Sequence, residues 1–380
     1  MTDSFYQPRR AAFWVLLALT VNGIFYTGHL FSVGLRVVPV TALLGLAVWG
    51  VYAGLFVLAF RTLDLLEQHG REAFVLAFGW GGLGAVYFAA PANRAIQNLC
   101  AKLVSPEFAA RWGPAAAGPI TEEFLKIAGV ILLVLVARSA FRTHLSVLVV
   151  GAVAGLGFQV VENLSATVNA SMHFPLENQV RPVLLNLLTR GLMSGLWSHA
   201  AYTTIASYGI AWFLLHPARP MAARLGVALL CFALAWAMHF AWNSPLLEDL
   251  FDGGYAQMAL LLAVKGVPAM MAAGIFWHAA ARENGAYLHA HAAYLVPERD
   301  LIRDDEWVRL GAPMARYRVR RIIGRRFGRP ARRLKAQLQR EQLRLIRKAA
   351  TYGRGPQTQR HETAVRRLRA ELDALMTPRP

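Results

Sequence analysis

Charged residues and cysteines are both scarce in this sequence of 380 residues. Only 16% of the residues are Asp, Glu, Lys or Arg, whereas 56% are hydrophobic. Soluble globular domains usually carry about 25% charged residues, so the composition favours a membrane protein. The two cysteines, Cys100 and Cys231, are too few for a disulfide framework and do not indicate a redox compartment.

Several sequence patterns of membrane-embedded hydrolases are also missing. There is no His-Glu-x-x-His motif, because the one His-Glu pair, His361-Glu362, has no second histidine four positions on. No aspartate lies inside an apolar run, which excludes a two-aspartate site. The surroundings of Ser194 lack the spacing expected of a rhomboid-type serine nucleophile. The sequence therefore disfavours three common protease chemistries.

What the sequence has in abundance is long apolar runs. A helix needs about 20 mostly apolar residues to cross a bilayer. Residues 91–118 mix charged and apolar side chains and predict an amphipathic surface segment instead. The apolar run at residues 185–214 is longer than one span requires, and its helix could begin as late as Arg190. We predict an all-α, polytopic bundle of about eight transmembrane helices, near residues 11–33, 40–60, 73–90, 119–137, 145–167, 185–214, 224–245 and 256–280.

Positive charge is concentrated at the C-terminal end. Residues 281–380 hold 24 Lys and Arg against 10 Asp and Glu, and so carry most of the net charge of +18. We predict a transmembrane domain at residues 1–280 followed by a basic, partly helical cytoplasmic tail at residues 281–380. The basic residues between the apolar runs fall mainly on the side of the N-terminus, which predicts that both termini are cytoplasmic. We expect an integral protein of a bacterial inner membrane.

The tail combines dense arginine with regularly placed leucine. Residues 316–333 are strongly basic, and leucines follow at positions 334, 338, 343 and 345. This pattern predicts a segment that lies on anionic lipid. A solvated basic helix that pairs with itself or with a partner stays open as an alternative. Nucleic-acid binding is not expected, because the tail lacks the interleaved aromatic residues that stack on bases.

Ionisable residues inside apolar runs are costly and are therefore functional candidates. With the predicted topology, and at a rise of about 1.5 Å per residue, every ionisable residue of this kind except Lys265 lies within about 15 Å of the outer face of the membrane. The apolar run at residues 145–167 also includes Gly151 and Gly155, whose spacing permits close approach of a second helix. The candidates are Glu122, Glu123 and Lys126 in the fourth run, Glu162 in the fifth, His199 in the sixth, His239 and Asn243 in the seventh, and Lys265 in the eighth.

Taken singly, these residues have ordinary structural explanations. Glu122 and Glu123 suit the first turn of a helix capped by Thr121. Each histidine could be a polar contact between helices, and Lys265 could pair with a glutamate or extend to the membrane surface. The shared depth of ionisable residues on four helices is what favours a functional site.

The motifs also resemble those of a known family. Glu122-Glu123-Phe-Leu-Lys126, then Phe-Gln-Val-Val-Glu162-Asn163, then His199, and then His-Phe-Ala-Trp-Asn243 occur in this order on successive predicted helices. This set is similar to the PrsW family of membrane endopeptidases, which is related to the CAAX prenyl-protein endopeptidases and bacteriocin-processing proteins. Glu162 stands where the CAAX branch typically has histidine, which favours the PrsW branch. The basic tail has no counterpart in the resemblance.

The resemblance implies peptide-bond hydrolysis on membrane-protein substrates. Glu122 would activate water as the base, with Glu123 adjacent and able to exchange roles with it. The two histidines would orient water or stabilise the oxyanion, Asn243 would donate to the same oxygen, and Glu162 would position a histidine. The implied catalytic set is Glu122, Glu123, Glu162, His199, His239 and Asn243.

The mechanism and the function class both have alternatives. Glu122, Glu162, His199 and His239 could instead hold zinc in an open site, although we favour a glutamic mechanism that requires no cofactor. From other classes, a proton-coupled transporter would distribute ionisable groups across the whole membrane, whereas these gather near one face. A non-catalytic scaffold that binds membrane segments is the remaining alternative.

Overall fold

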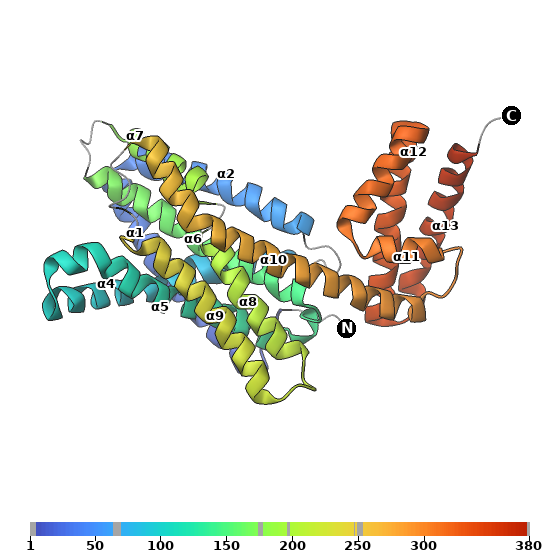
Figure 1. Cartoon of the computed structure of the whole chain (residues 1–380), viewed down its shortest axis with the longest axis horizontal. Helices are drawn as coiled ribbons and strands as arrows, with labels where there is room; N and C mark the ends of the chain where they lie inside the picture. Colours follow the sequence, from blue (N-terminus) through green and yellow to red (C-terminus); the bar gives the residue numbers. More distant parts are fainter. Residues whose placement is uncertain are drawn as a thin grey trace. The chain divides into compact units, whose positions relative to one another are not determined.

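The computed structural model describes residues 5–63, 70–173, 178–195, 198–246, 248 and 254–377. Regular structure among these residues is helical throughout, and the chain divides between Trp277 and His278 into a membrane unit and a tail unit. The helices shown in Figure 1 are α1 (Ala11–Val37), α2 (Pro39–Leu63), α3 (Arg71–Gly79), the π-helix η1 (Trp80–Ala85), α4 (Val86–Leu103), α5 (Pro106–Val136), the short 3₁₀ turn η2 (Arg138–Ala140), α6 (His144–Met172), α7 (Arg181–Asn186), the π-helix η3 (Leu187–Met193), α8 (His199–Leu215), α9 (Met221–Asn243), α10 (Tyr255–Leu295), α11 (Asp304–Leu310), α12 (Pro313–Tyr352) and α13 (Pro356–Met376).

Among the residues that the structure describes, six helical segments are long and apolar enough to cross a bilayer, so the expected count of eight is not confirmed. The fourth expected span lies in α5, where Glu122, Glu123 and Lys126 add charge to the apolar stretch. The sixth is interrupted, and the part that remains, α8, has only 17 residues. The six segments are Ala11–Val37, Pro39–Arg61, Arg71–Leu103, His144–Met172, Met221–Asn243 and Ala256–Ala290.

Helix α6 is the core of the membrane unit. It packs against α2, α3, α5, α8 and η1, and nearly all of its apolar stretch is buried. Small residues make these contacts close. A Cβ added to Gly151 would lie 1.9 Å from the Ser207 hydroxyl, and one added to Gly155 would lie 2.4 Å from the carbonyl oxygen of His199. The expected glycine face is thus confirmed as the contact surface with α8.

The segment at residues 91–118 belongs to a helical hairpin. It comprises the C-terminal part of α4 and the first part of α5, which pack against each other. Ser105 begins α5 as its N-cap, and its hydroxyl accepts a hydrogen bond from the Phe108 amide at 3.0 Å. The hairpin therefore leads directly into the part of α5 that carries the paired glutamates.

The tail unit has its own apolar core between α11, α12 and α13. Helix α12 bends at Gly328, whose φ of 84° is the left-handed conformation that glycine adopts without a Cβ clash. Leu338, Leu343 and Leu345 are buried in this core. These leucines are therefore not free to lie on lipid as the sequence pattern predicted.

Candidate active site

Helix α5 supplies a carboxylate pair with a buried cation beside it. Glu122, Glu123 and Lys126 are all buried, and Glu123 and Lys126 are fully so. The Lys126 ammonium lies 2.7 Å from Glu123 Oε1. Residues four apart share a helix face, which would favour Glu122 as the partner of Lys126, but the ion pair forms with Glu123. Glu123 is thereby fixed in the interior by Lys126, whereas Glu122, which is also buried, borders two cavities.

His239, on α9, is held by residues on both of its nitrogens. Its Nδ1 lies 2.7 Å from Glu123 Oε1, and its Nε2 lies 3.1 Å from the Asn243 amide nitrogen one helical turn later. Glu123 is an acceptor and Asn243 Nδ2 is a donor, so the neutral ring carries its proton on Nδ1. The Tyr202 ring stacks on the imidazole, with centroids 5.0 Å apart. The ring of His239 is thus fixed in one orientation.

His199 begins α8 after a break in the helix. The π-helix η3 ends at Met193, and α8 starts at His199 itself, so the predicted continuous helix from residue 185 is wrong. His199 Nε2 lies 2.7 Å from Glu162 Oε2 on α6, and its Nδ1 lies 2.9 Å from the Lys126 ammonium. The break lets the histidine project from a helix end toward the carboxylates instead of along a continuous helix face.

Glu122 stands between the two histidines. Its Oε2 lies 3.7 Å from His199 Nδ1 and 3.8 Å from His239 Nε2, and it makes no hydrogen bond within the described residues. Its Oε1 accepts a hydrogen bond of 2.9 Å from the Asn93 amide. A buried carboxylate oxygen without a partner marks the point at which an additional group would be bound.

Two cavities reach this point from different sides. The first, of ≈ 390 Å³, is bordered by both histidines and Asn243, together with residues of η3 and α10. The second, of ≈ 350 Å³, runs between α1, α4 and α6 and has mainly apolar walls. Both cavities are lined by Asn93, Glu122 and Glu162. The unpaired oxygen of Glu122 therefore lies where a polar cavity and an apolar one come together.

The structure brings together all six residues of the predicted set, from α5, α6, α8 and α9. Sequence reasoning missed three of their neighbours. Asn93 holds Glu122, Arg190 pairs with Glu162 at 2.8 Å, and Tyr202 stacks on His239. Arg190 was used only as a helix boundary. Tyr202, three residues after His199, could have been found from the shared helix face.

Lys265, which the sequence left unplaced, lies outside the cluster. Its ammonium donates to the Ser244 carbonyl at 2.5 Å and lies 3.7 Å from Glu248. The structure does not support a serine nucleophile either, because the Ser194 hydroxyl donates to the Arg190 carbonyl oxygen. Within the described chain, neither residue forms a hydrogen bond or ion pair with the carboxylates and histidines of the cluster.

The arrangement fits a divalent metal ion. Glu122, His199 and His239 can each offer one atom, and the three atoms lie within 4.8 Å of one another. Two ligands held at about 2.1 Å in a tetrahedral shell lie about 3.4 Å apart, close to the separations found here. On each histidine, the opposite nitrogen contacts a carboxylate, which is the usual orientation of a metal-binding imidazole. Glu162 contacts the far nitrogen of His199 and so lies outside this triad.

Comparison with known proteins gives a family match and no closer relative. Neither the curated proteins nor the solved structures contain a significant match. A family model described as "PrsW family intramembrane metalloprotease" matches residues 69–273, which is more than half of the chain and includes every residue of the cluster. Together with the six apolar helices, the match establishes an integral membrane enzyme that cleaves peptide bonds. The chain belongs to the PrsW family of intramembrane proteases.

Proposed function

We propose that Glu122, His199 and His239 form the hydrolytic centre of this protease and hold a divalent metal ion of the zinc class. The observation that carries this proposal is the unpaired Oε2 of Glu122, which faces one nitrogen of each histidine. Such an ion, when bound, supplies Lewis acidity toward a peptide carbonyl and makes water a stronger nucleophile. The metal-free mechanism that the sequence favoured becomes the alternative that the experiment below must exclude.

Two carboxylates act as positioning residues in this proposal. Glu123 holds His239 and Glu162 holds His199, each through a hydrogen bond of 2.7 Å. Lys126 and Arg190 pair with these carboxylates and fix them in turn. Each imidazole is thereby held in the tautomer that leaves the lone pair on the nitrogen nearer to Glu122.

Donors for the developing oxyanion lie beside the same nitrogens. The Asn243 amide now contacts His239 Nε2, and the Lys126 ammonium contacts His199 Nδ1. Both donors become available to a substrate oxygen once the two nitrogens engage another group. The Tyr202 hydroxyl is buried without a hydrogen-bond partner in the described chain and is a further donor. Groups of this kind stabilise the tetrahedral intermediate of acyl transfer.

The substrates are proposed to be membrane-protein segments that enter from the apolar cavity. Its walls include Leu30, Phe31 and Val168, and it ends at Glu122 and Glu162. The polar cavity on the other side would admit water. This division keeps an apolar segment and the hydrolytic water apart until both reach the carboxylate.

The localisation proposed from the sequence is a bacterial inner membrane with both termini in the cytoplasm. The excess of Lys and Arg on that side and in the tail supports this orientation. We further propose that the basic surface of the tail contacts anionic lipid. Reporter fusions at Met1 and Pro380 should both report cytoplasm, and an outward C-terminus would contradict the orientation.

Metal analysis of the purified full-length protein tests the hydrolytic centre. We expect about one zinc-class ion per chain, loss of that ion in Glu122→Gln, His199→Ala and His239→Ala, and retention in His144→Ala. His144 is the matched control because it is also buried and begins α6, 18 residues and about 27 Å from Glu162. Proteomic comparison of cells with the wild type and with Glu122→Gln would identify substrates, whose cleavage should fall at least about 100-fold. Full activity in rigorously metal-free protein would instead favour Glu122 as a general base without a metal.

A further inference from the structure

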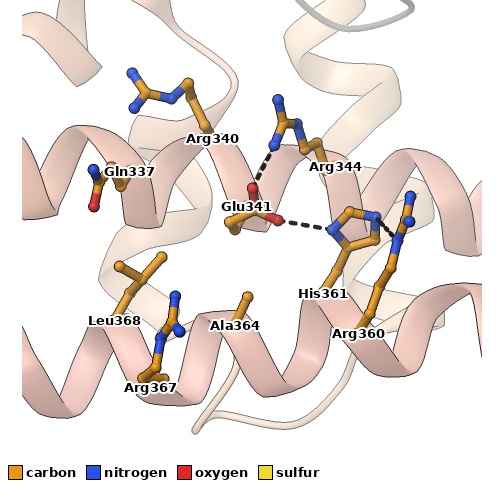
Figure 2. A pocket seen from close by; sticks show the side chains of 9 residues that line it. All are labelled: Gln337, Arg340, Glu341, Arg344, Arg360, His361, Ala364, Arg367 and Leu368. Carbon is orange, nitrogen blue, oxygen red and sulfur yellow. Dashed lines mark hydrogen bonds and ion pairs between the residues drawn. The ribbon is translucent and has the colours of Figure 1, made fainter.

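The tail unit contains a pocket whose walls are rich in arginine. It lies between α12 and α13, with a volume of ≈ 620 Å³, and is separate from the hydrolytic site. Figure 2 shows Arg340 and Arg344 on α12 and Arg360 and Arg367 on α13 around it. All four side chains are exposed, so their charged ends are accessible from solvent.

One carboxylate lines the pocket among the described residues, and it is already engaged. Glu341 Oε2 lies 2.7 Å from His361 Nδ1, and Glu341 Oε1 accepts from Arg344 at 2.5 Å. Burial by itself would raise the pKa of Glu341, but the hydrogen bonds from His361 and Arg344 outweigh it and lower the pKa. Glu341 is therefore ionised at neutral pH and balances a single arginine.

The other arginines have little to balance them. Arg360 Nε donates to the neighbouring His361 ring at 3.3 Å, and within the described tail Arg367 has an exposed contact of 3.6 Å with Glu371. Arg340 forms no ion pair within the described part of the tail. Three arginines without a carboxylate partner close by thus line one pocket, where like charges repel unless an anion lies between them.

Further arginines extend the same positive region along α12. Partial burial, together with the charges of Arg332 and Arg340, lowers the pKa of Arg320. A Cβ on Gly324 would lie within 3.0 Å of the Arg332 side chain, because the bend at Gly328 folds the helix back on itself. The bend thus concentrates cations that a straight helix would keep apart.

We propose that this pocket binds a phosphate group carried as a monoester or polyphosphate. Arginine binds phosphate oxygens in pairs through its planar fork, and several arginines suit a group with several terminal oxygens. No Phe, Tyr or Trp is among the described lining residues, and the one imidazole, that of His361, is held by Glu341, so the pocket offers little stacking surface for nucleic-acid bases. A lipid headgroup and a soluble phosphate compound share this chemistry.

The full-length protein in nanodiscs of neutral lipid allows a test with inorganic pyrophosphate as the soluble probe. Calorimetry compares the wild type with Arg340→Gln/Arg360→Gln/Arg367→Gln and with the control Arg318→Gln/Arg321→Gln/Arg325→Gln. Both triple variants lose the same charge from exposed positions, but the control residues do not line the pocket. We expect the pocket variant to weaken binding at least about tenfold and the control to change it much less.

A second arm identifies the source of the phosphate. Nanodiscs that contain phosphatidate, which has a phosphomonoester headgroup, are compared with nanodiscs that contain phosphatidylglycerol, and hydrogen exchange is measured in α12 and α13. Protection by phosphatidate that depends on the pocket arginines supports a headgroup, and binding of pyrophosphate supports a soluble source. Equal losses in the pocket and control variants, or binding of neither probe, would overturn the proposal. Pocket-dependent retention of single-stranded nucleic acid without pyrophosphate binding would also overturn it.

Discussion

The carboxylate of Glu123 contacts Nδ1 of His239 at 2.7 Å, although the two residues lie 116 positions apart. This contact joins α5 to α9 and fixes the ring that faces Glu122. Since Glu123 is fully buried and also pairs with Lys126, it has no access to the cavities. The adjacent glutamates of one motif therefore have different roles, one toward the site and one behind it.

The first prediction follows from this division. Glu123→Gln keeps the size of the side chain but removes the charge that orients His239 and pairs with Lys126. Metal affinity should fall about 10- to 100-fold, as for other residues that hold a metal ligand. Titration of the metal-free protein with zinc measures this. Glu107→Gln is the matched control, because Glu107 is an exposed glutamate on the same helix. Unchanged affinity in Glu123→Gln would contradict the positioning role.

The second prediction concerns the contact between α6 and α8. A methyl group on Gly155 would lie 2.4 Å from the His199 carbonyl oxygen, and backbone atoms cannot turn aside as a side chain can. Gly155→Ala should therefore displace His199 from Glu162 and lower the turnover rate by about 100-fold, the effect expected for a shift of about 1 Å. Gly54→Ala is the control, because a methyl group there meets open space. Normal turnover in Gly155→Ala would show that α8 tolerates the shift.

The third prediction concerns Asn93, which the motifs did not include. Its amide holds Glu122 Oε1 at 2.9 Å and leaves Oε2 directed at the histidines. Asn93→Ala should reduce zinc affinity about tenfold or more and should leave folding intact, because the residue is only partly buried. Asn22→Ala, which removes an exposed amide bonded to its own helix, should have no such effect. An Asn93→Asp variant with lower affinity than the wild type would separate loss of the donor from loss of volume.

Much of the site could be predicted from the sequence, because each ionisable residue inside an apolar run is costly to bury in a membrane and can be recognised by itself. Glu162 and His239 stand out inside apolar runs, and depth along the helix predicted that they meet. The pairing of Lys126 with Glu123 could not be read in this way, because positions 123 and 122 are both within reach of residue 126. The break before His199 was also missed. Ser194, Gly195 and Ser198 lie at the break, but small polar residues of this kind also occur inside membrane helices, so the sequence did not mark an end of the helix.

The structure of the tail could also be predicted only in part from the sequence, for a different reason. Its arginines were read correctly as a basic, helical region, but leucines at positions 338, 343 and 345 fit either a lipid-facing helix or a protein core. The bend at Gly328 decides between them, because it lets α12 fold back and bury those leucines with α13. Gly328 and Pro330, two residues apart, are a turn signal of the kind that interrupts a helix, and the sequence-based prediction gave it no weight.

The final prediction is a pH dependence of the tail unit that arises from Glu306. Its carboxylate lies 2.6 Å from both Lys335 and Arg369, and it accepts from Gln342 at 2.8 Å. Burial by itself would raise the pKa of Glu306, but the hydrogen bonds and charges of Arg369 and Lys335 outweigh it and lower the pKa to about 2.

A lowered pKa in the folded tail means that the unfolded tail binds the proton more readily. The stabilisation from Glu306 is therefore complete above about pH 4.5, its ordinary value, and is lost as the pH falls toward about 2. Glu306→Gln should remove this part of the pH dependence, and it should destabilise the tail by about 3 to 5 kcal/mol at neutral pH because two buried cations lose their partner. Hydrogen exchange of α12 and α13 in the full-length protein measures both effects. Asp305→Asn, which removes an exposed carboxylate one residue away, should leave the profile unchanged. Identical profiles for the wild type and Glu306→Gln would mean that the core of leucines, and not this buried ion network, governs the acid stability of the tail.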